Sequence, residues 1–185
     1  MSDVLDKPDP LLTEEQARRY LESLRWPEGP ACPHCGATEC KRLRHRQDST
    51  ARPGLWRCAG CRRQFTVTVK TIFDGSKLPL LIWLRAVALL CARPKGIPVR
   101  QLQEELAVSY RGAWAITDRI RYAATQAPFP QNRRGPVPRR MPGPAKLYPL
   151  SVSEALVFLL RTVPERKHPE ALERRHALWE QRSRS

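Results

Sequence analysis

The sequence predicts a small mixed α+β protein in which a ribbon of short antiparallel strands precedes a three-helix domain and a tail rich in proline and arginine. Three observations support this prediction. Two CxxC pairs, Cys32–Cys35 and Cys58–Cys61, flank a segment of 22 residues. Alternation of β-branched residues at 64–69 gives way to helical spacing of apolar residues from Leu80 onward. Residues 126–150 then hold seven prolines and four arginines.

The paired CxxC motifs have the spacing of two zinc knuckles, each of which offers two thiolates to one tetrahedral ion. Gly36 and Gly60 give the chain the backbone freedom that it needs around a metal. The alternatives are disulfides and thiols that recur by chance. A CxxC pair rarely recurs twice by chance, Met1–Pro10 lacks a secretory signal, and thiols stay reduced inside cells. We therefore predict one structural Zn²⁺ on Cys32, Cys35, Cys58 and Cys61, with bystander roles for His34, Cys40, His45 and Cys91.

The charge of the chain favours a polyanionic partner. The formal net charge is +15, from 33 Lys+Arg against 18 Asp+Glu, which suits DNA or RNA better than an acidic small molecule. A merely basic, soluble surface is the alternative. The longest apolar run, Leu78–Ala92, is interrupted by Arg85 and is too short to span a bilayer. We expect a cytoplasmic, nucleoid-associated bacterial protein that binds double-stranded DNA, with no membrane and no small-molecule substrate.

Residues 1–27 and 28–76 are predicted as an N-terminal helical segment and the ribbon. A capping box at Thr13–Gln16 predicts a helix to about Arg25, whose apolar face should pack on the ribbon together with Trp26. Strands are predicted before Cys58 and over Gln64–Val69. The basic run between the cysteine pairs is either a phosphate-contacting finger or a solvated loop, and the candidate DNA contacts in it are Arg42, Arg44 and Arg46.

Residues 77–125 are predicted as a helix-turn-helix domain. Helices are expected over Leu80–Ala92, Val99–Leu106 and Tyr110–Thr125, the last with Ser109 as its N-cap. Its inner side should hold Ala113, Trp114, Ile116, Thr117 and Ile120. The second helix of such a motif presents its N-terminal residues to base edges. The candidate contacts are Tyr110, Arg111, Thr117, Asp118 and Arg121, with Arg100 near phosphate. An ordinary three-helix bundle is the alternative.

The rest of the chain is predicted as a linker, residues 126–150, and a tail, residues 151–185. Ser151 or Ser153 could cap a helix through Val163, and Pro169 could start another through Arg182. These helices have too little apolar surface to be stable alone. The abrupt change in composition motivates the hypothesis that the tail is a remnant translated from a displaced reading frame, which the encoding DNA would test.

Several segments of the chain resemble the N-terminal part of the zinc-ribbon transposases of bacterial insertion sequences. In and around the ribbon they are Ala17–Glu22, Leu24–Pro27, Cys32–Gly36, Trp56–Cys58, Cys61–Val67 and Thr71–Phe73. Further along they are Gly96–Ile97, Arg100–Leu102, Val108–Tyr110, Ala113–Trp114 and Arg119–Arg121. The resemblance implies a zinc ribbon and a helix-turn-helix that recognise terminal inverted repeats, followed by an RNase-H-like domain whose Asp, Asp and Glu hold two metal ions.

The sequence departs from this family after Arg121. It contains no further Asp, and its remaining acids are Glu154, Glu165, Glu170, Glu173 and Glu180. Two-metal phosphoryl transfer needs several carboxylates that converge from a packed scaffold. We therefore expect a DNA-binding transposase-like protein that is inactive alone and that associates with its own copy or with a full-length transposase. The alternatives are a regulatory protein that binds RNA or a protein partner, and an enzyme whose catalytic domain another polypeptide supplies.

Overall fold

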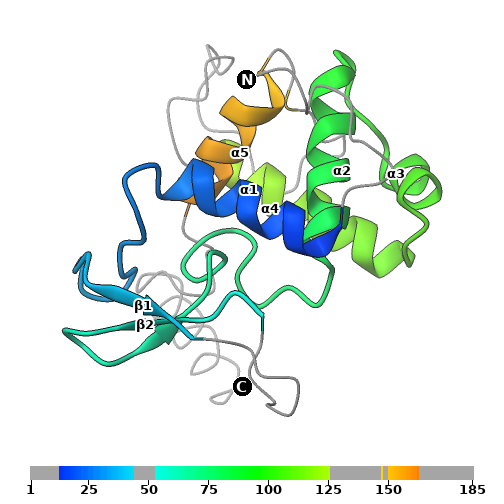
Figure 1. Cartoon of the computed structure of the whole chain (residues 1–185). Helices are drawn as coiled ribbons and strands as arrows, with labels where there is room; N and C mark the ends of the chain where they lie inside the picture. Colours follow the sequence, from blue (N-terminus) through cyan, green and yellow to red (C-terminus); the bar gives the residue numbers. More distant parts are fainter. Residues whose placement is uncertain (1–12, 44–52, 126–146, 148–149, 163–185) are drawn as a thin grey trace, which may run out of the picture.

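The computed structural model describes residues 13–43, 53–125, 147 and 150–162, and it confirms a small mixed α and β architecture (Figure 1). A three-stranded antiparallel sheet has the order β1-β2-β3. The elements are α1 (Glu14–Arg25), β1 (Cys40–Arg42), β2 (Trp56–Cys58), β3 (Gln64–Phe65), α2 (Leu80–Ala92), α3 (Val99–Leu106), α4 (Tyr110–Thr125) and α5 (Val152–Arg161).

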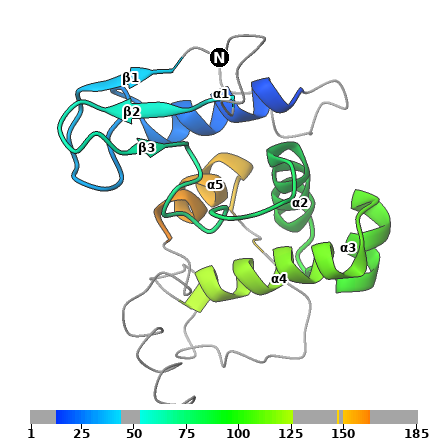
Figure 2. The same ribbon diagram turned by 90° about the horizontal axis from the view of Figure 1, so that it is seen from below.

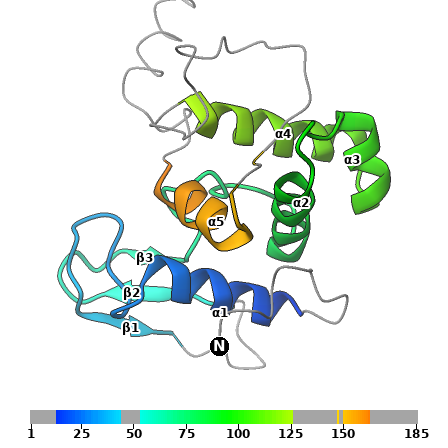
Figure 3. The same ribbon diagram turned by 90° about the horizontal axis from the view of Figure 1, so that it is seen from above.

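The elements stack in layers that are visible from two sides of the molecule. Figures 2 and 3 show the sheet and α1 at one side, α2 and α5 in the middle, and α4 at the far side with α3 at its end. The predicted bounds of α2, α3 and α4 are confirmed. Among the described residues, no helix is long and apolar enough to cross a bilayer.

Helix α1 begins at the predicted capping box, in which Thr13 and Gln16 exchange two hydrogen bonds of 2.7 and 3.2 Å. The expected packing of its apolar face was wrong. Ala17 and Leu21 are fully buried in the core that α2 and α5 also form, and among the described residues Trp26 alone packs against both this core and the ribbon cluster. The amphipathic pattern identified the buried face but not its partner, because any apolar surface satisfies such a face.

The first turn of α2 is capped from α1. Pro79 precedes α2 and provides no side-chain cap, so the first N–H groups of this helix need another acceptor. The Glu14 carboxylate accepts the N–H groups of Leu80 and Leu81 at 2.9 and 3.1 Å. A negative charge also suits the positive end of the helix dipole. This contact fixes the start of α2 against the start of α1.

Two strands of the sheet differ from the prediction: β3 is shorter than expected, and β1 was not predicted as a strand. The predicted strand over Gln64–Val69 ends at Phe65, because turns follow in which Val69 N bonds Thr66 O at 3.2 Å. These turns carry Val67, Ile72 and Phe73 into the helical core. Conversely, β1 lies in the basic run that was expected to be a finger or a loop.

Helix α4 has the predicted N-cap, since Ser109 Oγ accepts the N–H of Gly112 at 3.2 Å. Its predicted inner side is correct except at one position. The side chain of Trp114 is 49% exposed and points away from the core. The other predicted inner residues are buried, namely Ala113, Ile116, Thr117 and Ile120.

Helix α5 is part of the main core. A capping box at Ser151 and Glu154 starts it, and one face is buried against α1 and α2. Nearby, Leu147 is fully buried and its N–H donates to Leu90 O at 3.3 Å. Helix α5 would have too little apolar surface to be stable alone, and its packing against α1 and α2 therefore stabilises it. The second predicted tail helix, Pro169–Arg182, and the linker up to residue 146 lie outside the described residues. The buried positions of α5 are Val152, Ala155, Leu156, Leu159 and Leu160.

Replacing Ser151 with alanine should lower the free energy of unfolding by about 1 kcal/mol, because the first turn of α5 loses its side-chain acceptor. Ser151 Oγ accepts from Glu154 N at 3.3 Å and donates to Glu154 Oε2 at 2.7 Å. Ser153→Ala is the matched control, since Ser153 does not cap the helix. Equal unfolding free energies for the two variants in urea titrations would contradict the assignment of the cap.

The same contacts lower the pKa of Glu154, first through the Ser151 hydroxyl and then through the Ser151 backbone N–H. A depressed carboxyl pKa means that the fold favours the charged form. This contribution is present above the unfolded pKa and is lost as the pH falls through the folded pKa. The difference in unfolding free energy between the parent protein and Ser151→Ala should therefore become smaller in acid.

Candidate metal centre and nucleic-acid interface

The four cysteines of the two CxxC pairs meet at one point of the ribbon. Their sulfur atoms all lie within 4.8 Å of one another. Cys32 and Cys61 are separated by 3.6 Å between Sγ atoms, and Cys35 and Cys58 by 3.5 Å. A tetrahedral ion with metal–sulfur bonds of about 2.3 Å requires sulfur–sulfur distances of about 3.8 Å. The donor set therefore fits a single tetrahedral metal ion.

Backbone geometry positions the thiols in the two knuckles. Gly36 and Arg62 each follow the second cysteine of a pair, and both adopt left-handed backbone conformations, with φ of +79° and +59°. In the first knuckle Gly36 N donates to Cys32 O at 2.9 Å. The glycine suits this conformation, whereas Arg62 holds it at a steric cost. The paired turns bring all four sulfurs to the same side.

Backbone N–H groups point at two of the four sulfur atoms, and one of them stabilises the thiolate form of Cys58. The His34 N–H points at Cys32 Sγ, and the Cys61 N–H points at Cys58 Sγ, each at 3.4 Å. The Cys61 N–H is the main reason why the pKa of Cys58 falls to about 7. A thiolate is the form that ligates metal. The ribbon thus favours the ligating state at this position.

The remaining cysteines do not belong to the cluster. Cys40 donates its S–H to Ala37 O at 3.5 Å, and burial, followed by the neighbouring Cys58 and Cys32 thiols, raises its pKa. Cys91 is buried on α2 in the helical core. Within the described part of the chain, the four CxxC cysteines are the one group of three or more His, Cys, Asp or Glu side chains that is arranged to hold a metal ion. His45 lies outside that part.

An aromatic cluster joins the ribbon to α1. Trp26 meets Trp56 and Phe65 edge to face, with ring centroids 6.2 and 5.7 Å apart. Trp56 Nε1 donates to a Glu22 carboxylate oxygen at 3.3 Å. Such pairs add about 0.5–1.5 kcal/mol each beyond their buried area. The ribbon is therefore fixed to α1 next to the metal site.

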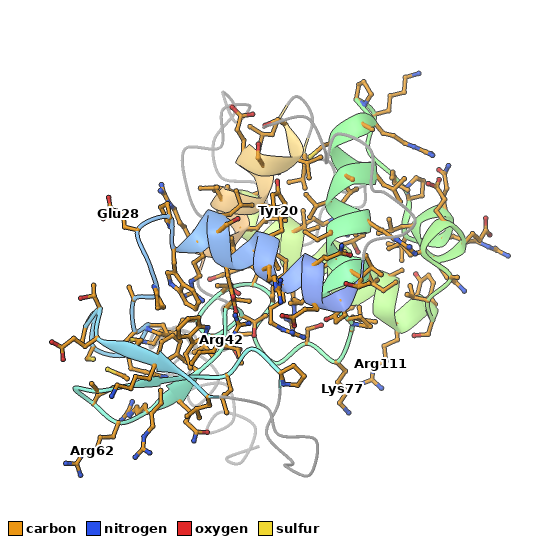
Figure 4. The ribbon with its side chains drawn as sticks, viewed as in Figure 1. Tyr20, Glu28, Arg42, Arg62, Lys77 and Arg111 are labelled. Atoms are coloured by element: carbon orange, nitrogen blue, oxygen red, sulfur yellow. The ribbon has the colours of Figure 1, made fainter. Side chains whose placement is uncertain are left out.

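Arg42 takes part in the same junction. Its guanidinium stacks on Trp56 at 5.5 Å and lies 3.7 Å from the carboxylates of Glu15 and Glu22. Figure 4 shows Arg42 between the sheet and α1. A phosphate contact by this residue would compete with two carboxylates. The other two candidates in the basic run, Arg44 and Arg46, lie outside the described residues.

The segment between the ribbon and α2 is held from both sides by arginines. Arg25 of α1 donates to Val67 O at 2.5 Å, and Arg119 of α4 donates to Ile72 O and Asp74 O at 2.6 and 3.0 Å. Burial lowers the pKa of Arg25 to about 10, and Arg25 still remains charged near pH 7. These bonds fix the position of the ribbon relative to the helices.

The outward face of α4 gathers part of the predicted DNA-contacting set. Tyr110 is 56% exposed, and Arg111 and Asp118 are also exposed. Thr117 is fully buried and donates its hydroxyl to Trp114 O at 2.9 Å, so its side chain has no access to a base edge. Arg121 is half-buried. On α3, Arg100 is exposed and lies 4.0 Å from Glu104.

Two surface residues near the start of α4 were missed by sequence reasoning. Trp114 joins Tyr110 and Arg111 on the exposed face, one helical turn along. Lys77 is exposed and precedes Leu78, whose side chain lies beside Gly112 of α4. Figure 4 shows Lys77 and Arg111 extending to the same side of the molecule. Only the tertiary fold brings Lys77 to this helix.

Comparisons with known proteins agree with the ribbon geometry. Residues 12–64 match the family described as the transposase zinc-ribbon domain. A Halobacterium salinarum protein, described as an uncharacterized protein in transposable element ISH50, is 31% identical over 132 residues. The match covers 68% of this chain and 40% of that protein, so the chain spans less than half of the relative's length. No solved structure matches the chain.

Proposed function

We propose that this chain, whose residues 12–64 match the family of transposase zinc-ribbon domains, binds double-stranded DNA at the terminal inverted repeats of an insertion sequence. In this proposal α3 and α4 act as a helix-turn-helix, and one Zn²⁺ stabilises the ribbon. The observation that carries the proposal is the face of α4 that exposes Tyr110, Arg111 and Trp114 to solvent.

Zinc is the metal that the donor set favours. Four thiolates in a tetrahedral arrangement are soft ligands, and closed sites of this kind are typical of structural zinc. Because all four positions are taken by sulfur, no coordination site is left for water. The ion would therefore hold the ribbon together and would have no hydrolytic role.

Two features of α3 and α4 support the proposed role of α4 as a recognition helix. The link 107–109 is short, and Ala107 closes α3 with a left-handed φ of +52°. In a helix-turn-helix, residues of the first turns of the second helix reach base edges in the major groove. Arg111 could pair with guanine, and the two aromatic rings could contact thymine methyl groups or sugars.

We assign DNA docking, and no catalytic step, to this chain. In this proposal another segment or polypeptide, such as a full-length transposase with which this chain associates, catalyses strand transfer. The relative from ISH50 extends well beyond the matched part, as the 40% coverage shows. The proposal therefore concerns the DNA-binding portion of the reaction.

The proposal predicts a loss of sequence discrimination when α4 is altered. Arg111→Gln should weaken binding to the inverted-repeat duplex by about 5- to 150-fold, equivalent to about 1–3 kcal/mol, and should weaken binding to a shuffled duplex less. Fluorescence anisotropy at fixed salt measures both affinities. Lys95→Gln, which removes one exposed charge between α2 and α3, is the matched control. Equal affinity of the parent protein for both duplexes would refute specific DNA binding.

A protein partner is the second candidate function. Exposed tyrosine and tryptophan side chains next to arginine are also typical of binding hot spots between proteins. In that case Trp114→Ala would abolish association with the partner and leave DNA affinity unchanged. Stacking of RNA bases on the ribbon has less support, because Phe65 is buried and Trp56 packs against Trp26.

A further inference from the structure

The two faces of the ribbon sheet differ in chemistry. In the register, Arg42 pairs with Trp56 and Trp56 pairs with Phe65, and these side chains pack toward α1 and Trp26. The alternate positions form the opposite face. There Lys41 lies across from Arg57, and Arg57 lies across from Gln64, and all three are exposed. We call Lys41, Arg57 and Gln64 the outer face of the ribbon.

This outer face is electrostatically unfavourable in the protein alone. Like charges directly across a pair of strands repel and destabilise the sheet. Lys41 and Arg57 form no ion pair within the described residues, and neither do Arg62 and Arg63, which follow the second knuckle. By contrast, Arg42 on the inner face has two carboxylates nearby. An anionic ligand on the outer face would relieve the repulsion.

The metal centre offers a competing explanation for these cations. Four thiolates on one divalent ion carry a net charge of −2, which nearby guanidinium groups would stabilise. The nearest acid along the strand is Glu39, which is exposed and forms no ion pair with the outer-face cations in the described residues. Charge balance at the metal predicts an effect of Arg57 on zinc retention. Ligand binding predicts an effect on association instead.

We propose that the outer face of the ribbon binds the phosphate backbone of the same duplex that α4 reads. This inference rests on the function proposed above and adds a second, sequence-independent contact. Figure 4 shows Arg62 of the ribbon, Lys77 and Arg111 extending toward the same side of the molecule. Arg25 and Arg119 hold the segment between the ribbon and α2, which fixes the ribbon relative to α4, and the proposal requires that one duplex contacts both surfaces.

Salt dependence of binding provides the test. Each phosphate contact contributes about −0.9 to the slope of log K against log[salt], so Arg57→Gln should reduce the magnitude of the slope by about 0.9 and Lys41→Gln/Arg57→Gln by about twice that. Between 50 and 200 mM salt, the affinity of a variant that has lost one contact would thus fall about 3.5-fold less than the affinity of the parent protein. Binding to inverted-repeat and shuffled duplexes should weaken equally. Lys95→Gln should leave the slope unchanged.

The outcomes separate this inference from the proposed function. Zinc content, measured in every variant, should stay at one ion per chain. If the parent protein prefers the inverted repeat but Arg57→Gln keeps the parental slope, the outer-face proposal is wrong and the role of α4 stands. Loss of zinc in Arg57→Gln with an unchanged slope would assign the cations to the metal centre. If the parent protein shows no preference for the inverted repeat but the slope of Arg57→Gln is reduced as expected, the outer face binds phosphate and the proposal that α4 recognises the repeat is wrong.

Discussion

Replacing Cys58 with serine should abolish zinc binding and unfold the ribbon. In the described part of the ribbon few side chains are buried, and the core cluster there consists of Cys32, Cys58 and Phe65. Such a cluster cannot offset the conformational entropy of an ordered ribbon. Structural zinc supplies about 10–16 kcal/mol of apparent binding free energy in small domains, and that binding energy is folding energy. Chelation of the metal should have the same effect.

Cys40→Ser is the matched control for this prediction. It makes the same chemical change in the residue paired with Cys58 across the sheet, but Cys40 is outside the four-cysteine cluster. It should retain one zinc ion per chain by atomic absorption and the near-ultraviolet circular dichroism of the Trp26–Trp56 pair. Stoichiometric zinc in Cys58→Ser, or its loss in Cys40→Ser, would contradict the ligand assignment.

The unfolding should stay within the ribbon. Ala17 and Leu21 of α1 pack on α2 and α5, so the helical core does not depend on the metal for its contacts. Far-ultraviolet circular dichroism should therefore keep its helical signal after chelation. Specific DNA binding should persist in weakened form if α4 reads the sequence.

Features with local signals were predictable from the sequence. A capping box specifies the start of a helix within four residues, as at Thr13, and the CxxC spacing identifies metal ligands without knowledge of the fold. Features that depend on which elements pack together could not be predicted from the sequence. The apolar face of α1 could have packed on the ribbon or on helices, and only the assembled core decides between them.

The candidate site shows the same division. The short strand β1 has two exposed residues, so its sequence looks like a solvated basic run. The cationic outer face appears only when the pairing of Lys41 with Arg57 is known, because a shift by one residue would exchange the two faces. Trp114 was placed inward because it is apolar, whereas its exposure suggests a role in binding.

Replacing Leu156 with alanine tests whether α5 belongs to the fold. Leu156 is fully buried in the core that α1 and α2 share, so its truncation should lower the free energy of unfolding by about 2–5 kcal/mol. Val157→Ala is the matched control on the same helix, because Val157 is only partly buried and should cost less than about 1 kcal/mol. Urea titration followed by tryptophan fluorescence measures both.

The result bears on the origin of the C-terminal part. A segment translated from a displaced frame would have no selected reason to carry a capping box and five buried residues that match the surface of α1 and α2. If α5 were such a remnant and did not dock, Leu156→Ala would leave the unfolding free energy of the core unchanged. A cost of several kcal/mol would instead mean that α5 completes the core on which α1 and α2 depend, because cavity formation destabilises only a site that is packed in the native state.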